Sequence, residues 1–451
     1  MGNGAAICRL GGIGDNLIVS STLPLLREKY GWLEVITQPP QSAIFENNPH
    51  IDRLSERPRN SLPQDGMAWQ KWFTDRAIEY DFFCNLSHSV ETMVALTQGQ
   101  TQFYWPTAFR QQYCGVNYLE RVHDIVGVPH QFNPRFYPTL KERDRAAETK
   151  CGMGNTVIGW CLAGSRLDKV YPPSALAIAR LIRELGVSVV MFGSPGRDFE
   201  GAKIILQHVT DANGSHQGLH LALSPDPENP SWPIRRMLTQ IGTCDLVIGP
   251  DTGAMWSVAM EDMPKVMLLS HASAENITKH WRNTTTLHAD PKRVPCWPCH
   301  QLHETPETCR PNAANNGAAC ISDISVEMIV ATVRRLLQTG IPYDGPSTDL
   351  PCDAGKIGAL SAGDHRGSIA SLCGADGAKR QRPDPTTATG ADFWRPCHAV
   401  HTADPACGRT RAVRPAGNGG QSDECADDRA LVSDDGSGRG PDTGADRRPD
   451  Q

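Results

Sequence analysis

The sequence predicts an α/β protein with two domains, each built around a parallel sheet, and a C-terminal tail without regular structure. Short apolar runs alternate with segments of helical periodicity, once in residues 1–150 and again in residues 151–340. Such alternation favours right-handed βαβ units. From about residue 341 the alternation stops. A chain of 451 residues is also too long for one ordinary core.

Composition excludes several classes of function. Hydrophobic residues make up 39% of the chain and charged residues 21%, with a net charge of −6, so nothing predicts a nucleic-acid partner. No apolar run approaches the roughly 18 residues that a membrane helix needs, and the first residues lack the features of a secretory signal. We therefore expect a cytoplasmic protein with at most peripheral membrane contact.

The first series of elements begins with a strand and a long helix. Asp15 or Asn16 is the expected cap of that helix, and Gly31 follows its end. The predicted strands are 5–8, 33–37 and 80–86, and the predicted helices are 15–31 and 118–128.

The second series contains an almost fully apolar strand at 187–193, as expected where both faces of a sheet are covered. The polar, glycine-bearing segment 141–155 between the two series is predicted to be a hinge. The other predicted strands are 156–162, 245–250 and 265–270, and the predicted helices begin or lie at 173–186, 234–244, 252–260 and 324–340.

The last 111 residues are rich in Gly, Ala, Pro, Asp and Arg and show no sustained period. This composition favours a disordered tail over residues 341–451. Translation from a shifted reading frame would also produce such a segment, and the sequence leaves both interpretations open.

Three strand-to-helix loops carry candidate functional residues. The first carries Gly11, Gly12 and Gly14, which permit close approach of a ligand, and then Asp15, which is either a general base or a helix cap. The pattern is not GxGxxG, so a dinucleotide-binding fingerprint is absent.

The second loop follows strand 156–162 and the third follows strand 245–250. Small residues ending in Ser165 precede Arg166 and Lys169, a combination that can hold phosphate, although a solvated turn has the same composition. In the third loop, Asp251, Thr252 and Gly253 open a helix, where either anion binding or capping applies. Ligands of open α/β sheets bind beyond the carboxyl ends of strands, so three such loops in two halves favour a cleft between two domains.

These motifs, taken in order, resemble the heptosyltransferase-like glycosyltransferases of family 9. The resemblance covers roughly residues 5–338 and rests on these five segments: RLGGIGDNLIVSSTLPLLREKYG, AGSRLDKVYPP, FGSPGRDFEGAK, DLVIGPDTGAMWSVAM and VPCWPCHQ. It implies a GT-B fold, with two Rossmann-like domains facing across a cleft. It also implies inverting, metal-independent and cofactor-free transfer of a sugar, often a heptose, from a nucleotide-diphosphate donor to a lipopolysaccharide-type, lipid-linked or other glycan acceptor at the inner membrane.

The resemblance also implies roles for single residues. Asp15 would deprotonate the acceptor hydroxyl, Lys169 would neutralise the leaving diphosphate, and the amides around Thr252 and Gly253 would hold phosphates. Ser165 and Arg166 would contact the donor. The sequence departs from the family at Trp256, where a His is usual, and at Tyr171, where a Trp is usual. An indole cannot titrate as an imidazole does, but it can stack on a sugar or base, or simply pack.

Four cysteines, Cys296, Cys299, Cys309 and Cys320, form a C-x2-C-x9-C-x10-C pattern. The first pair suggests zinc, but the second half lacks a matching pair, so a metal site, loop packing and a disulfide all stay open.

Two rival functions also stay open. One is another GT-B enzyme such as a nucleotide-sugar epimerase, which would need no acceptor. The other is an inactive sugar-nucleotide-binding protein, which the Trp256 departure and the unusual tail favour.

Overall fold

The computed structural model describes residues 4–63, 65–87, 93–96, 98–154, 156–162, 166–226, 231–302, 309, 311–339 and 400–401. The chain divides into two compact units, Met1–Thr402 and Ala403–Gln451, and all described residues belong to the first. The predicted tail therefore lies almost entirely outside the described residues. Within them, no helix combines the length and apolar character needed to cross a membrane.

The first sheet has the strand order β11-β4-β1-β2-β3. All its pairs are parallel except β11 with β4. Alternate residues of β1 face opposite sides: Ala5 and Ile7 pack with the core of α1, α2 and α6, whereas Ala6 and Cys8 pack toward α3. The strands are β1 (Ala5–Cys8), β2 (Leu33–Thr37), β3 (Arg53–Glu56), β4 (Phe82–Asn85) and β11 (Val400–His401).

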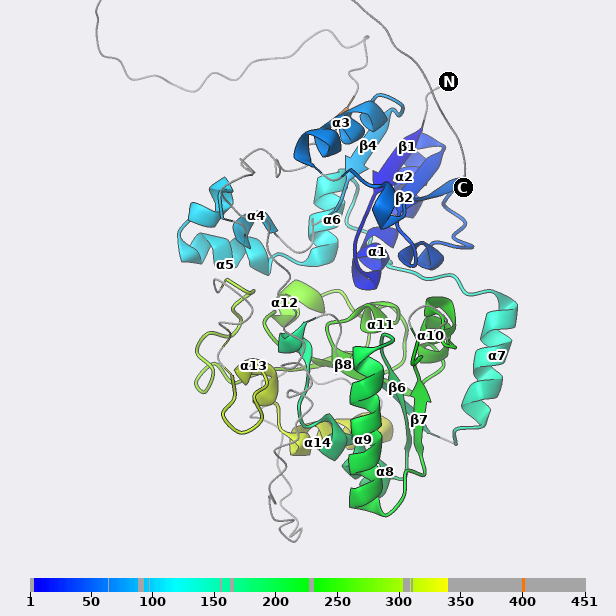
Figure 1. The fold of residues 1–451 in the computed structure, drawn as a ribbon, viewed down its shortest axis with the longest axis vertical. Coiled ribbons are helices and arrows are strands. Elements are labelled where there is room, and N and C mark those ends of the chain that lie inside the picture. Colours follow the sequence, from blue (N-terminus) through cyan, green and yellow to red (C-terminus); the bar gives the residue numbers. More distant parts are fainter. Residues whose placement is uncertain are drawn as a thin grey trace, which may run out of the picture. The chain divides into compact units, whose positions relative to one another are not determined.

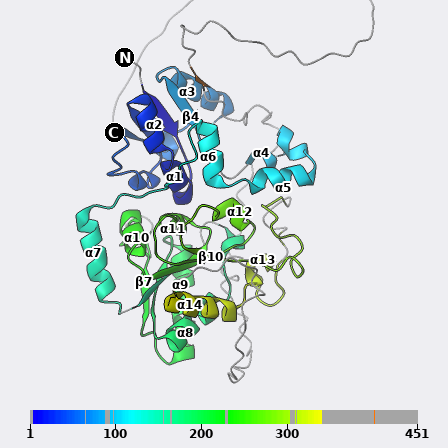
Figure 2. The ribbon, with the colours of Figure 1, turned by 180° about the vertical axis from the view of Figure 1, so that it is seen from behind.

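The second sheet is wholly parallel, in the order β10-β9-β8-β5-β6-β7. One face packs on α8, α9 and α14, and the other faces α10 and α11, so its central strands are buried on both sides. Figure 2 shows α8 and α14 side by side. The strands are β5 (Val157–Cys161), β6 (Ser188–Phe192), β7 (Leu219–Ala222), β8 (Leu246–Pro250), β9 (Lys265–Leu268) and β10 (Thr284–Leu287).

The helices cover the faces and ends of the two sheets. The α-helices of the first half are α1 (Ile13–Ser20), α2 (Leu23–Tyr30), α3 (Gly66–Ala77), α4 (Met93–Leu96), α5 (Thr107–Gly115), α6 (Tyr118–Val126) and α7 (Leu140–Cys151). Those that follow are α8 (Ser174–Leu185), α9 (Arg197–Asn213), α10 (Ile234–Ile241), α11 (Gly253–Trp256), α12 (Ala274–Ile277), α13 (Ala319–Ser322) and α14 (Val326–Thr339). Short 3-10 turns are η1 (Gln41–Ile44), η2 (Arg59–Ser61), η3 (Thr101–Tyr104) and η4 (Leu167–Lys169).

The single helix predicted for residues 15–31 is wrong in two respects. It is two helices, because Pro24 has no N–H to continue the ladder and instead occupies the first turn of α2. It also begins earlier, with Gly12 as its N-cap and Asp15 in the third helical position. The predicted end at Gly31 is confirmed, with a left-handed backbone (φ 73°).

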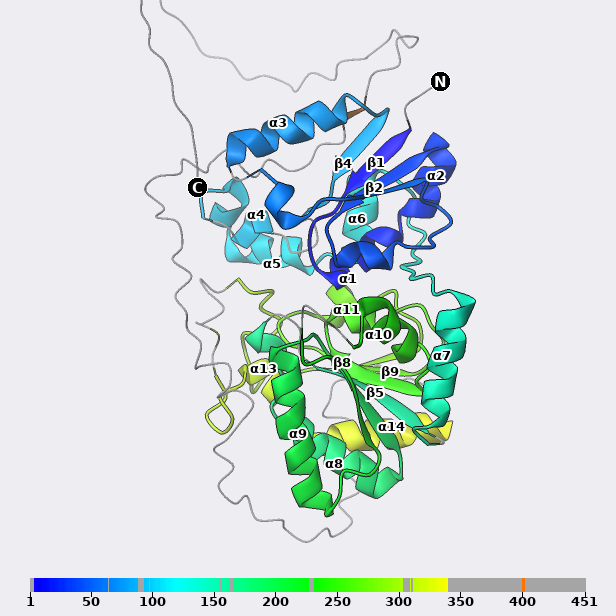
Figure 3. The same ribbon diagram turned by 45° about the vertical axis from the view of Figure 1, so that its right-hand side comes forward.

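The hinge predicted at 141–155 is also wrong, because most of that segment is helix α7. A capping box joins Thr139 and Glu142 at its start, and its Glu, Arg, Ala and Lys residues are strong helix formers. Ala146 is its buried residue, and the helix packs on α10 (Figure 3). The polarity of the segment reports exposure rather than loop structure.

Candidate functional site

Two neighbouring strands of the second sheet end in charged turns. β5 and β8 are paired in parallel, so their carboxyl ends lie together. Turn η4 follows β5 and ends at Lys169, and Asp251 directly follows β8. Lys169 Nζ lies 2.8 Å from Asp251 Oδ2. The structure thus joins two of the predicted site residues in one ion pair at the place where open α/β sheets bind ligands.

Asp251 is 9% exposed. Burial by itself raises the pKa of this carboxyl, but the Lys169 ammonium and the indole N–H of Trp256 hold the pKa below its ordinary value. Asp251 is therefore a carboxylate at neutral pH. Asp251 thus fixes the position of the Lys169 ammonium, a role that the sequence did not indicate.

A second buried carboxylate lies in the same turn. Asp168 Oδ1 accepts a bond from Arg166 Nε at 2.8 Å, and Oδ2 lies 2.9 Å from His271 Nδ1. Burial opposes the charge of Asp168, but His271 and Arg166 together hold its pKa well below the usual range. Burial lowers the pKa of His271, against the pull of Asp168. Ser165 lies outside the described residues.

Trp256 is buried, with 2% of its surface exposed. Its Nε1 donates to Asp251 Oδ1 at 2.9 Å, and its ring packs edge-to-face on Trp281, with centroids 4.8 Å apart. Of the roles predicted for this residue, packing fits the structure, because so little of the ring is open to a sugar or base.

Asp15 belongs to the first half of the chain. Its Oδ2 accepts the backbone N–H of Gly12 at 2.8 Å and lies 3.0 Å from Nη2 of Arg9, which is fully buried at the end of β1. The side chain is 22% exposed, so solvent reaches it. Asp15 thus combines a local capping role with a fixed orientation. A Cβ on Gly11 or on Gly12 would lie 3.1 Å from its Oδ2, which explains small residues at both places.

The starts of α1 and α11 are in contact (Figure 1). A Cβ on Gly253 would lie 2.6 Å from Ile13 Cβ, and one on Gly14 would lie 3.1 Å from Trp256 Cδ1. The first distance excludes a side chain unless the helices shift, and the second would require the indole to move by a few tenths of an ångström. These two glycines therefore serve the contact between the two halves, and that contact brings the helix of Asp15 to the helix that follows Asp251.

A cavity of about 830 Å³ opens beside this contact. Ile13, Thr252 and Gly253 line one part of it, and α7 and α10 line another. Its surface is mostly apolar, and the Thr252 hydroxyl is buried with no hydrogen-bond partner among the described residues. An apolar cavity with a few polar groups at one end is typical of a small-molecule site.

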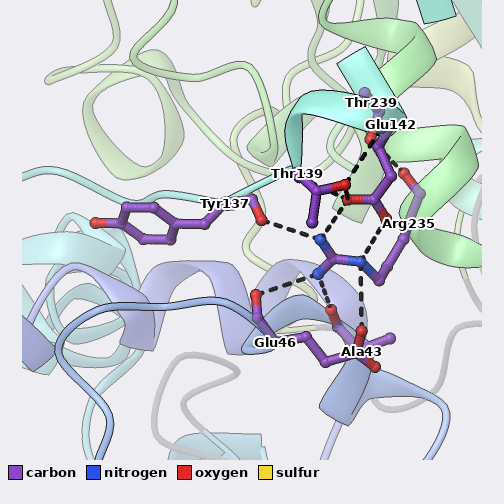
Figure 4. A network of polar contacts seen from close by, with 7 residues as sticks. All are labelled: Ala43, Glu46, Tyr137, Thr139, Glu142, Arg235 and Thr239. Carbon is purple, nitrogen blue, oxygen red and sulfur yellow. Dashed lines mark hydrogen bonds and ion pairs between the residues drawn. The ribbon is translucent and has the colours of Figure 1, made fainter. Parts of the chain in front are cut away.

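Arg235 of α10 joins three segments at the edge of this cavity (Figure 4). Its Nε and Nη2 each lie 2.7 Å from a Glu142 carboxylate oxygen, and Nη1 donates to the carbonyls of Ala43 and Glu46. Nη2 also donates to the Tyr137 carbonyl at 3.0 Å. Arg235 thus connects the second sheet, the segment before α7 and the first half, and no local sequence pattern marked it.

We predict that Arg235→Met lowers the free energy of unfolding by roughly 1–3 kcal/mol at neutral pH. The Arg235 guanidinium lowers the pKa of Glu142 to about 2. A depressed carboxyl pKa contributes stability above its ordinary value and loses it as the pH falls. The destabilisation should therefore shrink between about pH 5 and 2 when urea unfolding is followed by circular dichroism. Arg236→Met is the control, since Arg236 stacks over Trp232; equal pH profiles for both variants would contradict the prediction.

The four cysteines of the C-x2-C pattern lie near one another: beyond the effect of burial, Cys296 and Cys309 raise the pKa of Cys299, and Cys299 and Cys309 raise that of Cys320. In the described part of the chain, no group of three or more His, Cys, Asp or Glu residues could hold a metal ion. Cys296, Cys299, Cys309 and Cys320 are all free thiols, ranging from exposed to buried. Burial raises the pKa of Cys299 to about 11. No disulfide joins these four described residues, and the choice between loop packing and a metal site stays a prediction.

No protein-family model matches the sequence, and no curated protein matches it. The structure is similar to that of a glycosyl transferase of family 9 from Veillonella parvula, with 15% sequence identity and a TM-score of 0.53, over 75% of this chain and 98% of that one. It is also similar to the ADP-heptose lps heptosyltransferase II of E. coli, with 14% identity and a TM-score of 0.51, over 75% of this chain and 99% of that one. At these identities the likeness shows the fold, and the predicted GT-B fold is confirmed.

Proposed function

We propose that this chain is an inverting glycosyltransferase that moves a sugar from a nucleoside-diphosphate donor to a hydroxyl group of a glycan acceptor. One observation carries the proposal. The contact between α1 and α11 brings the helix of Asp15 to the helix that follows Asp251, the partner of Lys169, and the starts of both helices line the apolar cavity. A base, a fixed cation and a cavity of this size are the parts that such a transfer needs.

Each residue of the site has a separate role in the proposed reaction. Asp15 takes the proton of the acceptor hydroxyl, whose oxygen then attacks the anomeric carbon opposite the leaving diphosphate, which inverts the configuration. Lys169 and Arg166 face the negative charge that develops on the diphosphate. The nucleoside occupies the cavity, with the Thr252 hydroxyl as a partner for its polar groups.

The resemblance to family 9 and the fold of the E. coli ADP-heptose enzyme support an ADP-linked sugar such as ADP-heptose as the first donor to test, with an acceptor of lipopolysaccharide type. The residues of the site do not by themselves identify the nucleobase of the donor. Metal independence, which the resemblance to family 9 implies, and a cytoplasmic location are further parts of the proposal.

The proposal predicts that the full chain gains stability from one nucleotide class. A panel of ADP-, GDP- and UDP-sugars is screened by thermal shift. A ligand present at 100 times its Kd adds about 2.7 kcal/mol to the free energy of unfolding. A selective rise in Tm identifies the donor class, and release of the diphosphate on addition of a glycan acceptor then shows transfer.

Other outcomes are equally informative. Binding without turnover supports the inactive homologue, and sugar release without an acceptor supports an epimerase. If no nucleotide sugar raises the Tm of the folded chain, the proposed donor site is wrong.

A further inference from the structure

The Asp251 carboxylate receives one charged donor and one neutral donor. Lys169 Nζ lies on Oδ2 at 2.8 Å, and Trp256 Nε1 donates to Oδ1 at 2.9 Å. The carboxylate and the indole are both buried, whereas the Lys169 side chain is 18% exposed. A buried carboxylate oxygen without a donor is costly, so the indole N–H both satisfies Oδ1 and fixes the rotation of the carboxylate.

From this we infer that Trp256 is a positioning residue for the donor diphosphate, acting through Asp251 on Lys169; the inference rests on the proposed function. While the indole holds Oδ1, only Oδ2 is turned to the ammonium. An ammonium has three N–H donors, and Lys169 can then offer the others to phosphate oxygens. Without the indole N–H, the carboxylate turns both oxygens to Lys169 and competes with the phosphates.

The packing around Trp256 supports a fixed ring. Gly14 lies against Cδ1 on one side, and Trp281 packs edge-to-face on the indole. A ring held on both sides keeps its N–H direction, which a positioning role requires. Contact with the start of α1 also means that the ring is set by the same contact that brings Asp15 close.

An independent observation shows the same arrangement at the other cation of the turn. Asp168 receives Arg166 Nε on one oxygen and His271 Nδ1 on the other. In both cases a buried carboxylate is shared between a cation of the turn and a ring nitrogen from another segment. The repetition indicates that the turn from Arg166 to Lys169 is fixed in place by its carboxylates.

The test compares Trp256→Phe with Trp281→Phe in the full chain. Both changes remove an indole from the same cluster, but Trp281 Nε1 has no acceptor among the described residues. Affinities for ADP, GDP and UDP, and for the matching nucleosides, are measured by calorimetry. We expect Trp256→Phe to weaken the diphosphate that binds by about tenfold or more. The matching nucleoside should bind unchanged in Trp256→Phe. Trp281→Phe keeps an aromatic ring beside Trp256 and should cost clearly less diphosphate affinity than Trp256→Phe.

Two further variants separate positioning from packing. Trp256→His restores an N–H and should recover part of the lost affinity. In an Asp251→Asn background, Trp256→Phe should have little further effect, because residues that act through one another are non-additive. If Trp256→Phe fails to fold, the Trp256→His affinity and its change in the Asp251→Asn background decide.

The outcomes distinguish the inference from the proposed function. Unchanged diphosphate affinity in Trp256→Phe, equal losses in Trp281→Phe, or additive losses with Asp251→Asn each overturn the inference alone. A wild-type chain that binds none of the three diphosphates overturns the proposed function, and the inference falls with it.

Discussion

Replacing Asp15 with Asn is expected to slow sugar transfer by roughly 10²- to 10⁴-fold, the usual contribution of a general base. The amide oxygen can still accept the Gly12 N–H, so α1 should keep its first turn, but the amide cannot take a proton from the acceptor. The measurement is the rate of diphosphate release with donor and acceptor present. Donor affinity by calorimetry and circular dichroism should both stay close to wild type.

The chain offers a close control in Asp52. Its carboxylate also accepts one backbone N–H, that of Leu33 at 2.8 Å, and pairs with one arginine, Arg27 at 2.7 Å, and it is 26% exposed. Asp52→Asn thus removes the same kind of contacts from the same half of the chain, away from the loop of Asp15. Transfer at the wild-type rate in Asp15→Asn, or an equal loss in Asp52→Asn, would remove the base assignment. Loss of folding would leave Asp15 with a capping role.

Local chemistry accounts for the parts of the fold that the sequence predicted well. The apolar runs at β1, β2, β5, β6 and β8 predict buried parallel strands. Gly31 and Gly186 end helices in the left-handed conformation that glycine favours. The errors have local causes as well. Pro24 divides the first helix, and the polarity of α7 was taken for a hinge although its residues favour helix. Periodicity reports the presence of an element more reliably than its ends.

The site was only partly predictable, for a different reason. Asp251 directly follows β8, and Asp15 and Lys169 lie in the segments that follow β1 and β5, so their positions follow from the order of elements. The partners that hold them are distant in sequence. Lys169 and Asp251 are 82 positions apart, and Arg235 is 93 positions from Glu142. No spacing rule predicts such contacts, so the roles of Arg235, Asp168 and His271 became visible only in the folded chain. Gly14 and Gly253 were also only partly predictable. The sequence does not distinguish a glycine that makes room for a ligand from a glycine that makes room for a neighbouring helix.

Replacing Lys169 with Met is expected to lower the transfer rate by about 10²- to 10³-fold and to weaken donor binding. Met keeps the length of the side chain but cannot neutralise the diphosphate. The change should also act on stability, because among the described residues it leaves buried Asp251 with the indole N–H as its remaining hydrogen-bond donor. Removing one partner of a buried pair costs more than the pair itself contributes. The Tm of Lys169→Met at neutral pH should therefore lie below that of wild type.

The pH dependence of that loss follows from the Asp251 carboxyl. In the wild-type chain the pKa of Asp251 is depressed. The carboxylate therefore stabilises the fold at pH values above the ordinary pKa of an aspartate, and this stabilisation is lost as the pH falls. Without Lys169, burial opposes the charge and a neutral carboxylic acid is tolerated better. The difference in Tm between Lys169→Met and wild type should therefore narrow in acid.

The control for Lys169 lies at the other end of the same strand. Lys150 Nζ pairs with Asp245, which precedes β8, at 2.6 Å, whereas Asp251 follows β8. Lys150→Met removes a Lys–Asp pair from that strand at the end opposite to Asp251. It should lower Tm modestly, since both partners are partly exposed, and leave transfer unchanged. If Lys150→Met slows transfer as much as Lys169→Met does, the effect belongs to the strand and its stability. If only Lys169→Met slows transfer, the positive charge of Lys169 at the carboxyl end of β8 takes part in the reaction.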